Sequence, residues 1–169
     1  MQVKKILTKK IYLATDHAGF EAKELVKKYL DEEGLKFEDM GAFEYNEKDD
    51  YPDFISLAAE KVSENPNSTL GIIFGGSGQG EAMVANRYAN VRATVYYDGP
   101  REILELSKKH NSANILSIGA RFVNKEYLID VIKYWLDLEF SDEERHLRRV
   151  EKIEKLKIKK YENNKNSIL

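Results

Sequence analysis

Residues 69–75, TLGIIFG, form a near-continuous apolar run without a charged side chain. Such a run predicts a β-strand covered on both faces, as in the middle of a parallel sheet. Similar short runs alternate with segments of helical periodicity along the chain. Strands are predicted at 10–16, 35–41, 69–75, 91–97 and 114–120, and helices at 20–34, 52–64, 80–89, 100–111, 125–140 and from 142 to beyond 160. This alternation predicts a doubly wound α/β fold, with a five-stranded parallel sheet, helices on both faces and an extended C-terminal helix.

Length and composition narrow the class of protein. The 169 residues suit a single domain spanning 1–169, in which 1–9 and 162–169 are expected to be disordered tails. A formal net charge of −2 provides no overall positive field for nucleic acid. No apolar run approaches the ~20 residues that span a bilayer, so we expect no membrane partner. The absence of cysteine excludes disulfides, thiolate nucleophiles and cysteine-ligated metals, and it fits a cytoplasmic protein.

Polar residues follow three of the predicted strands, at the point where each strand ends. They are DHAG at 16–19, GGSGQGE at 75–81 and GAR at 119–121. Ligands of doubly wound sheets bind outside the carboxyl ends of the strands, where the strand order reverses. We therefore expect these three stretches to meet at one edge of the sheet.

The glycine-rich stretch 75–81 predicts a strand-to-helix turn that can hold an anion. Its backbone N–H groups and the N-terminus of the following helix both favour negative charge. Its spacing matches neither a P-loop nor a dinucleotide fingerprint. It is not a nucleophile elbow either, because Gln79 stands in place of the last glycine. Taken alone, the stretch is equally compatible with a tight turn that only lets the helix pack on the sheet.

Histidine and arginine residues supply further candidates. His17 follows the first strand, His110 ends the helix before the fifth strand, and His146 lies in the last helix. Arg145 and Arg149 are four residues apart on one helix face, where two guanidinium groups can grip a phosphate. An ordinary surface or structural role is the alternative for each of them. No H-x-x-x-H or H-E-x-x-H pair occurs, so no metal site is expected.

Taken together, these stretches resemble the type B ribose-5-phosphate isomerases, which are grouped with the galactose-6-phosphate isomerase subunits. The matching pieces follow the family's order across about residues 10–155; they are DHAGFEAKE, DYPDF, GIIFGGSGQGEAMVANR, HNSANILSIGAR and RHLRRV. The resemblance implies a Rossmann-like sheet, and homodimers or tetramers with active sites at the subunit interface. It also implies interconversion of ribose 5-phosphate and ribulose 5-phosphate without a metal or cofactor, as in the pentose phosphate pathway.

One departure from the commonest family pattern concerns the base. Many members carry a cysteine base at the end of the third strand, where this chain has Gly75. A second branch has the pattern G-G-S-G-x-G-E and uses its glutamate. This sequence resembles that branch, so the resemblance assigns the base to Glu81.

The resemblance also implies a role for the other site residues. The base would move a proton between C2 and C1 of the open-chain sugar through a cis-enediolate, after ring opening by His110. The catalytic residues would be Glu81, His110, Ser77 and Asp16, and the enediolate would be stabilised by the backbone N–H groups of Gly76, Ser77, Gly78 and Gly80. The phosphate would be bound by His17, Arg121, Arg145 and Arg149. The sugar hydroxyls would be contacted by Asp16, Tyr51 and Asn111. His146 matches a family position without an assigned role. On the last helix, Val150, Ile153 and Leu156 form an apolar series that suits docking on a partner.

Three alternatives remain open at this point. One is an isomerase of a six-carbon sugar phosphate, such as allose 6-phosphate or galactose 6-phosphate, and pocket length decides between the two substrate sizes. Another is a catalytically weak subunit of a heteromeric isomerase, against which Glu81, His110 and the two helical arginines argue. The third is a non-catalytic, flavodoxin-like module that binds a nucleotide or flavin phosphate.

Overall fold

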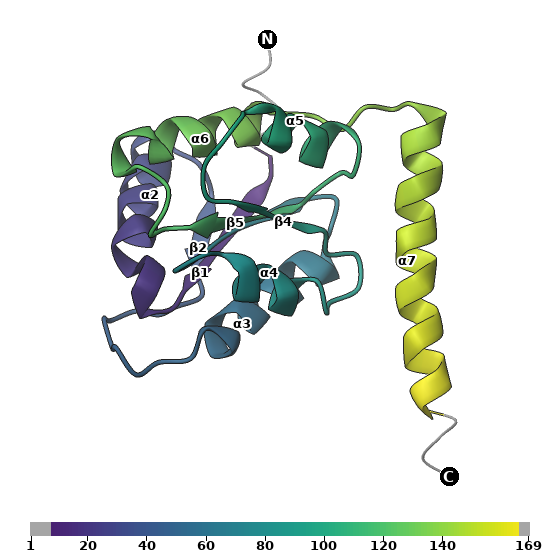
Figure 1. Cartoon of the computed structure of the whole chain (residues 1–169), viewed down its shortest axis with the longest axis horizontal. Helices are drawn as coiled ribbons and strands as arrows, with labels where there is room; N and C mark the ends of the chain where they lie inside the picture. Colours follow the sequence, from purple (N-terminus) through teal and green to yellow (C-terminus); the bar gives the residue numbers. More distant parts are fainter. Residues whose placement is uncertain (1–7, 166–169) are drawn as a thin grey trace.

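The computed structural model describes residues 8–165, with side chains up to residue 156, and it contains every strand and helix that the sequence predicts (Figure 1). The strands are β1 (Lys10–Thr15), β2 (Phe37–Asp39), β3 (Thr69–Gly75), β4 (Ala93–Tyr96) and β5 (Ile115–Gly119). The helices are α2 (Phe20–Glu32), α3 (Tyr51–Glu64), α4 (Gln79–Ala85), α5 (Glu102–Lys109), α6 (Lys125–Asp137) and α7 (Glu144–Lys165), and a 3₁₀ turn, η1, covers His17–Gly19. The bounds agree with the prediction to within a few residues.

The strands form one parallel sheet in the order β2-β1-β3-β5-β4. The chain passes from β1 outward to β2 and then returns across β1 to β3, so the direction of winding reverses between β1 and β3. The segments that follow these two neighbouring strands therefore leave the sheet towards opposite faces. A crevice opens where they separate, which is the place at which doubly wound sheets bind ligands.

Two apolar cores cover the two faces of the sheet. Ile11 and Leu13 of β1 point into the core formed with α2, α5 and α6, whereas Tyr12 and Ala14 point into the core formed with α3 and α4. Every residue of β3 is buried, as its apolar run predicted. The doubly wound α/β fold with helices on both faces is therefore confirmed.

Helix α7 stands apart from the layered body, on the right in Figure 1. Its Glu154 carboxylate accepts hydrogen bonds from the Arg92 side chain (2.9 Å) and from the Asn90 backbone N–H (2.8 Å). The expected tails lie mostly outside the described residues; of them, Thr8 and Lys9 precede β1 and 162–165 belong to α7. Within 8–165, no helix combines the length and the apolar character needed to cross a membrane.

A buried lysine fixes the loop that leads from β2 to α3. Lys23 of α2 is 0% exposed, and its ammonium group donates to the Asp39 carboxylate (2.6 Å) and to the Ala42 carbonyl (2.6 Å). Burial by itself would raise the pKa of Asp39. Hydrogen bonds from Lys23 and Lys27 outweigh that effect, so the pKa of Asp39 lies below its ordinary value. The ion pair ties α2 to the end of β2 and to the start of the following loop.

Replacing the buried lysine should destabilise the fold strongly. We expect Lys23→Ala to lower the free energy of unfolding by about 3 kcal/mol, because Asp39 then keeps only the partly exposed Lys27 as a charged partner and the Ala42 carbonyl loses its donor. Lys28→Ala, on the same helix, removes an exposed ion pair with Glu32 (3.8 Å) and should cost about 0.5 kcal/mol or less. Urea unfolding of both variants measures the difference. Equal losses in the free energy of unfolding would show that the buried ion pair stabilises the fold no more than the exposed one.

Candidate active site

A cavity of about 570 Å³ lies at the carboxyl ends of β1, β3 and β5. It is lined by Asp16, His17, Ala18, Tyr51, Gly76, Ser77, Gly80, Glu81, Arg121 and Phe122. The three polar stretches predicted to meet at one edge of the sheet therefore do so. Phe122 was not predicted from the sequence.

A smaller cavity of about 220 Å³ lies at the opposite, amino end of the strands. Lys9, Arg92 and Lys108 line it, and burial lowers the pKa of Lys108 well below its usual range. The Lys108 ammonium group lies 3.6 Å from the centroid of the Trp135 ring, near the C-termini of α5 and α6. Helix C-termini favour cations and disfavour anions. None of the predicted site residues lines this cavity, so we assign the candidate active site to the larger one.

Glu81 lies in the first turn of α4 and is 4% exposed. Its carboxylate occupies the space next to Gly75 at the end of β3, and a Cβ atom added at position 75 would overlap it. A cysteine at position 75 and a carboxylate in this place therefore exclude one another. This is a physical reason for the glycine that the sequence has there.

The environment of Glu81 favours its protonated form. Burial raises the pKa of the Glu81 carboxyl above its usual 4.5, and the nearby Asp16 carboxylate raises this pKa further; the backbone N–H of Glu81 acts in the opposite direction. A carboxyl whose pKa is moved towards neutrality can both accept and return a proton, as a general acid–base group must.

The glycine turn places backbone N–H groups beside this carboxylate. Gly78 has φ +76°, a left-handed conformation that glycine adopts without strain. Ser117 of β5 donates to the Gly78 carbonyl (2.6 Å), which holds the turn against the sheet. The N–H of Gly80 belongs to the first turn of α4, where N–H groups have no intrahelical partner. The turn can therefore stabilise negative charge that develops on a substrate oxygen.

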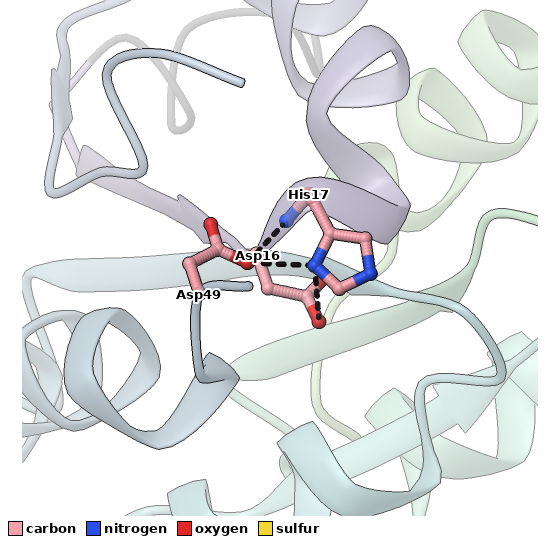
Figure 2. A group of neighbouring side chains, drawn as sticks. All are labelled: Asp16, His17 and Asp49. Carbon is pink, nitrogen blue, oxygen red and sulfur yellow. Dashed lines mark hydrogen bonds and ion pairs between the residues drawn. The ribbon is translucent and has the colours of Figure 1, made fainter. Parts of the chain in front are cut away.

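The residues that follow β1 form a hydrogen-bonded cluster with a residue from the loop before α3 (Figure 2). Asp16 accepts from the Ala18 backbone N–H (2.9 Å) and thereby caps the turn η1. His17 contacts Asp49 twice, through its backbone N–H (3.0 Å) and its ring Nδ1 (2.7 Å), both on Asp49 Oδ1. Asp49 was not predicted as a site residue, because its contact joins positions 32 residues apart and no local pattern signals it.

The same cluster offers the types of ligand atom that a metal site uses. Asp16, His17 and Asp49 each offer one ligand atom, and these atoms lie within 4.8 Å of one another. However, the 2.7 Å distance from His17 Nδ1 to Asp49 is that of a hydrogen bond, so Nδ1 carries a proton towards the carboxylate and presents no lone pair. This arrangement does not suit a metal ion.

Arg121 and Tyr51 border the cavity on either side of the glycine turn. The Arg121 backbone N–H donates to the Gly76 carbonyl (3.1 Å), and its guanidinium group packs beside the same glycine. The Tyr51 hydroxyl group packs against Gly80. A cation and a hydroxyl group therefore face the same cavity as Glu81.

Five of the predicted site residues do not line the cavity of their own chain: Gly78, His110, Asn111, Arg145 and Arg149. Gly78 lies in the glycine turn next to the cavity, whereas the other four come from the end of α5 and from α7. Arg145 and Arg149 are exposed on α7, and Arg145 pairs with Glu143 (2.8 Å). A single chain therefore brings together only part of the predicted site, and active sites at a subunit interface stay a prediction.

His110 ends α5 and contacts a second histidine. Its ring centroid lies 4.2 Å from that of His146, which is 1% exposed and lies 2.5 Å from Ser141 Oγ through Nδ1. Burial lowers the pKa of His146, and the neighbouring His110 lowers it further. The lowered pKa favours the neutral form of the His146 ring that packs against the ring of His110.

Comparison with known proteins gives consistent matches. A family model described as Ribose/Galactose Isomerase matches residues 11–153. A probable ribose-5-phosphate isomerase B from Mycoplasma pneumoniae is 39% identical over 143 residues, which cover 85% of this chain and 91% of that protein. The ribose-5-phosphate isomerase B of Mycolicibacterium paratuberculosis is 35% identical over 142 residues, covering 84% of this chain and 87% of that protein.

Solved structures agree with the sequence matches. The ribose-5-phosphate isomerase B of Mycoplasma genitalium, determined with bound ribulose-5-phosphate, has a TM-score of 0.83 at 32% identity and covers 89% of this chain and 97% of its own. The Clostridium thermocellum enzyme has a TM-score of 0.82 at 36% identity, covering 90% of this chain and 99% of its own.

The raised pKa of Glu81 predicts a pH-dependent gain in stability from Glu81→Gln. Because the folded-state pKa is raised, the stabilisation by Glu81 is complete below its ordinary value of 4.5 and is lost as the pH rises through the raised value. Glutamine carries no charge to bury, so the variant should be the more stable protein at neutral pH and lose that advantage in acid. Urea unfolding across this pH range measures it, with Glu60→Gln on the exposed face of α3 as the control. A pH-independent difference would contradict the prediction.

Proposed function

This chain belongs to the ribose/galactose isomerase family, and we propose that it interconverts ribose 5-phosphate and ribulose 5-phosphate. The observation that carries this proposal is the buried Glu81 carboxylate beside a glycine turn, in a cavity that also presents His17 and Arg121. The resemblance that the sequence shows to type B ribose-5-phosphate isomerases is confirmed by relatives of that name, one of them solved with ribulose-5-phosphate.

Glu81 is the base of this reaction. Isomerisation removes the proton from C2 of the open-chain aldose and returns it to C1, so one carboxyl group acts as base and then as acid. The raised pKa of Glu81 suits both steps. The intermediate is an enediolate, whose oxygen gains negative charge. The N–H groups of Gly76, Ser77, Gly78 and Gly80 lie in the turn beside the carboxylate and stabilise that charge.

The phosphate binds to His17 and Arg121 and not directly beside the Glu81 carboxylate. A permanent dianion beside Glu81 would be repelled by its carboxylate and by that of Asp16. Arg121 and the ring of His17 supply the cationic and donor groups that a phosphate needs. Tyr51 and Asp16 also line the cavity, where they can contact the sugar hydroxyls. The resemblance implies a reaction without a cofactor or metal.

A second copy of the chain completes the site. His110, Asn111, Arg145 and Arg149 are absent from the cavity of their own chain, yet the family pattern requires them for ring opening and phosphate binding. Ile153 and Leu156 of α7 are 39% and 63% exposed, as expected for a helix face that packs on a partner. We therefore infer a symmetric homodimer, or a tetramer built from it, with active sites at the subunit interface. A cytoplasmic location goes with this function and fits the absence of cysteine.

The reaction and the base are tested by one assay. We expect the wild type to isomerise ribose 5-phosphate and Glu81→Gln to lose about 10²-fold or more in kcat, because it removes the general base. Glu60→Gln serves as the matched control and should keep full activity. Turnover of allose 6-phosphate or galactose 6-phosphate in place of ribose 5-phosphate would overturn the substrate, and full activity of Glu81→Gln would overturn the base.

Sharing of the site between two copies predicts complementation. Glu81→Gln and Arg149→Ala should each be inactive, whereas a mixture refolded together should recover about a quarter of wild-type activity, since half of the dimers then carry one intact site. Glu81→Gln mixed with His17→Ala is the control. Both of these residues line the same cavity, so no mixed dimer regains a complete site. Equal recovery in the two mixtures, or none in the first despite mixed dimers in native mass spectra, would contradict the shared site.

A further inference from the structure

Asp49 is a buried carboxylate that touches the site without lining it. Its side chain is 8% exposed, and it lies on the Nδ1 side of the His17 ring (Figure 2) without being one of the residues that line the cavity. Asp49 Oδ1 accepts hydrogen bonds from both the backbone N–H (3.0 Å) and the ring Nδ1 (2.7 Å) of His17. One carboxylate oxygen therefore holds both the main chain and the side chain of this residue.

These two contacts determine which ring nitrogen can meet a ligand. Nδ1 donates to Asp49, so Nε2 is the nitrogen left for another group. The Asp16 carboxylate lies 3.9 Å from Nδ1, which is beyond hydrogen-bonding distance, so Asp16 does not compete for this proton. The Tyr45 ring, edge-on at 6.3 Å between centroids, packs against the imidazole. The orientation of His17 is therefore set by residues of the loop before α3.

We propose that Asp49 is a positioning residue for the phosphate end of the site: it orients His17 so that Nε2–H donates to a phosphate oxygen. The proposal rests on the proposed function, from which it takes a sugar phosphate as the ligand. In the bound state both ring nitrogens donate, so the ring is an imidazolium between the Asp49 carboxylate and the phosphate. Hydrogen bonds of this kind, between charged groups, are the strong ones.

The direction in which phosphate affinity changes on removal of the Asp49 charge distinguishes this positioning role from a purely electrostatic effect. Asp49 carries a negative charge close to a site for an anion. By Coulomb's law alone, removing that charge should strengthen phosphate binding. Positioning through His17 predicts the opposite, because a ring without its carboxylate partner is a poorer and less oriented donor. The neighbouring Asp50 is exposed and its side chain does not cap α3, so Asp50→Asn removes the same charge from the same loop without touching His17.

Binding of inorganic phosphate to the ligand-free protein is the first measurement. By titration calorimetry we expect the dissociation constant of phosphate to rise about tenfold in Asp49→Asn, and further in Asp49→Ala, as for loss of a hydrogen bond to a charged group. Asp50→Asn should leave it within about twofold, or lower it. Unchanged or tighter binding in Asp49→Asn, or equal weakening in Asp50→Asn, would overturn the proposal. Asp49→Asn preserves the shape of the side chain, so it keeps the test valid should Asp49→Ala fail to fold.

Two further readouts exclude a merely structural role. In the isomerase assay, KM for ribose 5-phosphate should rise about tenfold in Asp49→Asn with kcat within a few-fold of wild type, because the change affects phosphate binding and not the base. A fall in kcat with unchanged KM would overturn the proposal. Long-range ¹H–¹⁵N spectra of the ligand-free protein should show His17 as its Nδ1–H tautomer in the wild type, and a shift towards Nε2–H in Asp49→Ala. An Nε2–H tautomer in the wild type would also overturn it.

The binding and tautomer measurements do not depend on turnover. If the wild type fails to isomerise ribose 5-phosphate while Asp49→Asn still loses phosphate affinity relative to Asp50→Asn, the proposed substrate is wrong and the positioning role stands. If turnover is normal and phosphate affinity is unaffected, the function stands and the role of Asp49 is refuted.

Discussion

The placement of the Glu81 carboxylate over Gly75 is the contact on which the rest of the site depends. It requires that residue 75 carry no side chain, and it brings the proposed base from the start of a helix to the end of the central strand β3. The helix N-terminus favours the ionised carboxylate, whereas burial and the neighbouring Asp16 favour the protonated one. Burial prevails, and the pKa of Glu81 is raised. The same glycine turn that admits the carboxylate also carries N–H groups that can bind an oxyanion, so the proposed base and oxyanion site come from one short segment.

The cavity presents groups of both signs. Glu81 and Asp16 supply carboxylates, while Arg121 and the ring of His17 provide the groups that suit an anion. A sugar phosphate carries a dianion at one end and its reacting carbons at the other. With its phosphate on Arg121 and His17, the proposed substrate would direct C1 and C2 towards the Glu81 carboxylate. Exposed arginines on α7 lie outside this cavity, and a second copy of the chain is a direct way to bring such residues to a phosphate.

Local sequence pattern predicted most of the fold and the three polar stretches that meet at the cavity, whereas the roles of the site residues came from the family resemblance. The run TLGIIFG coincides with β3, and the glycine turn, Asp16 and Arg121 meet where parallel strands must bring them. Helix α4 was predicted to continue to residue 89 but ends at Ala85, because the Asn86 side chain pairs with the backbone of Ala93 (2.9 and 3.0 Å). Asp49 was missed for the same reason: its partner is distant in sequence. Helical spacing placed Arg145 and Arg149 on one face of a helix. Periodicity does not show, however, whether that face packs on the same chain or on a second copy.

The buried pair of Lys23 and Asp39 contributes to the arrangement of the site as well as to the stability of the fold. Such a pair is expensive to desolvate, and apolar residues of similar volume often serve a core equally well. Here the lysine also bonds the Ala42 carbonyl, and the Ala42 and Thr15 backbones are paired (2.9 Å), so the loop leaving β2 is fixed to the end of β1. Seven residues further along, that loop delivers Asp49 to His17, which itself follows β1 by two residues. The polar contacts of Lys23 thus fix the start of a segment whose other end holds the cavity-lining ring of His17, and a purely apolar core would not hold that carbonyl in place.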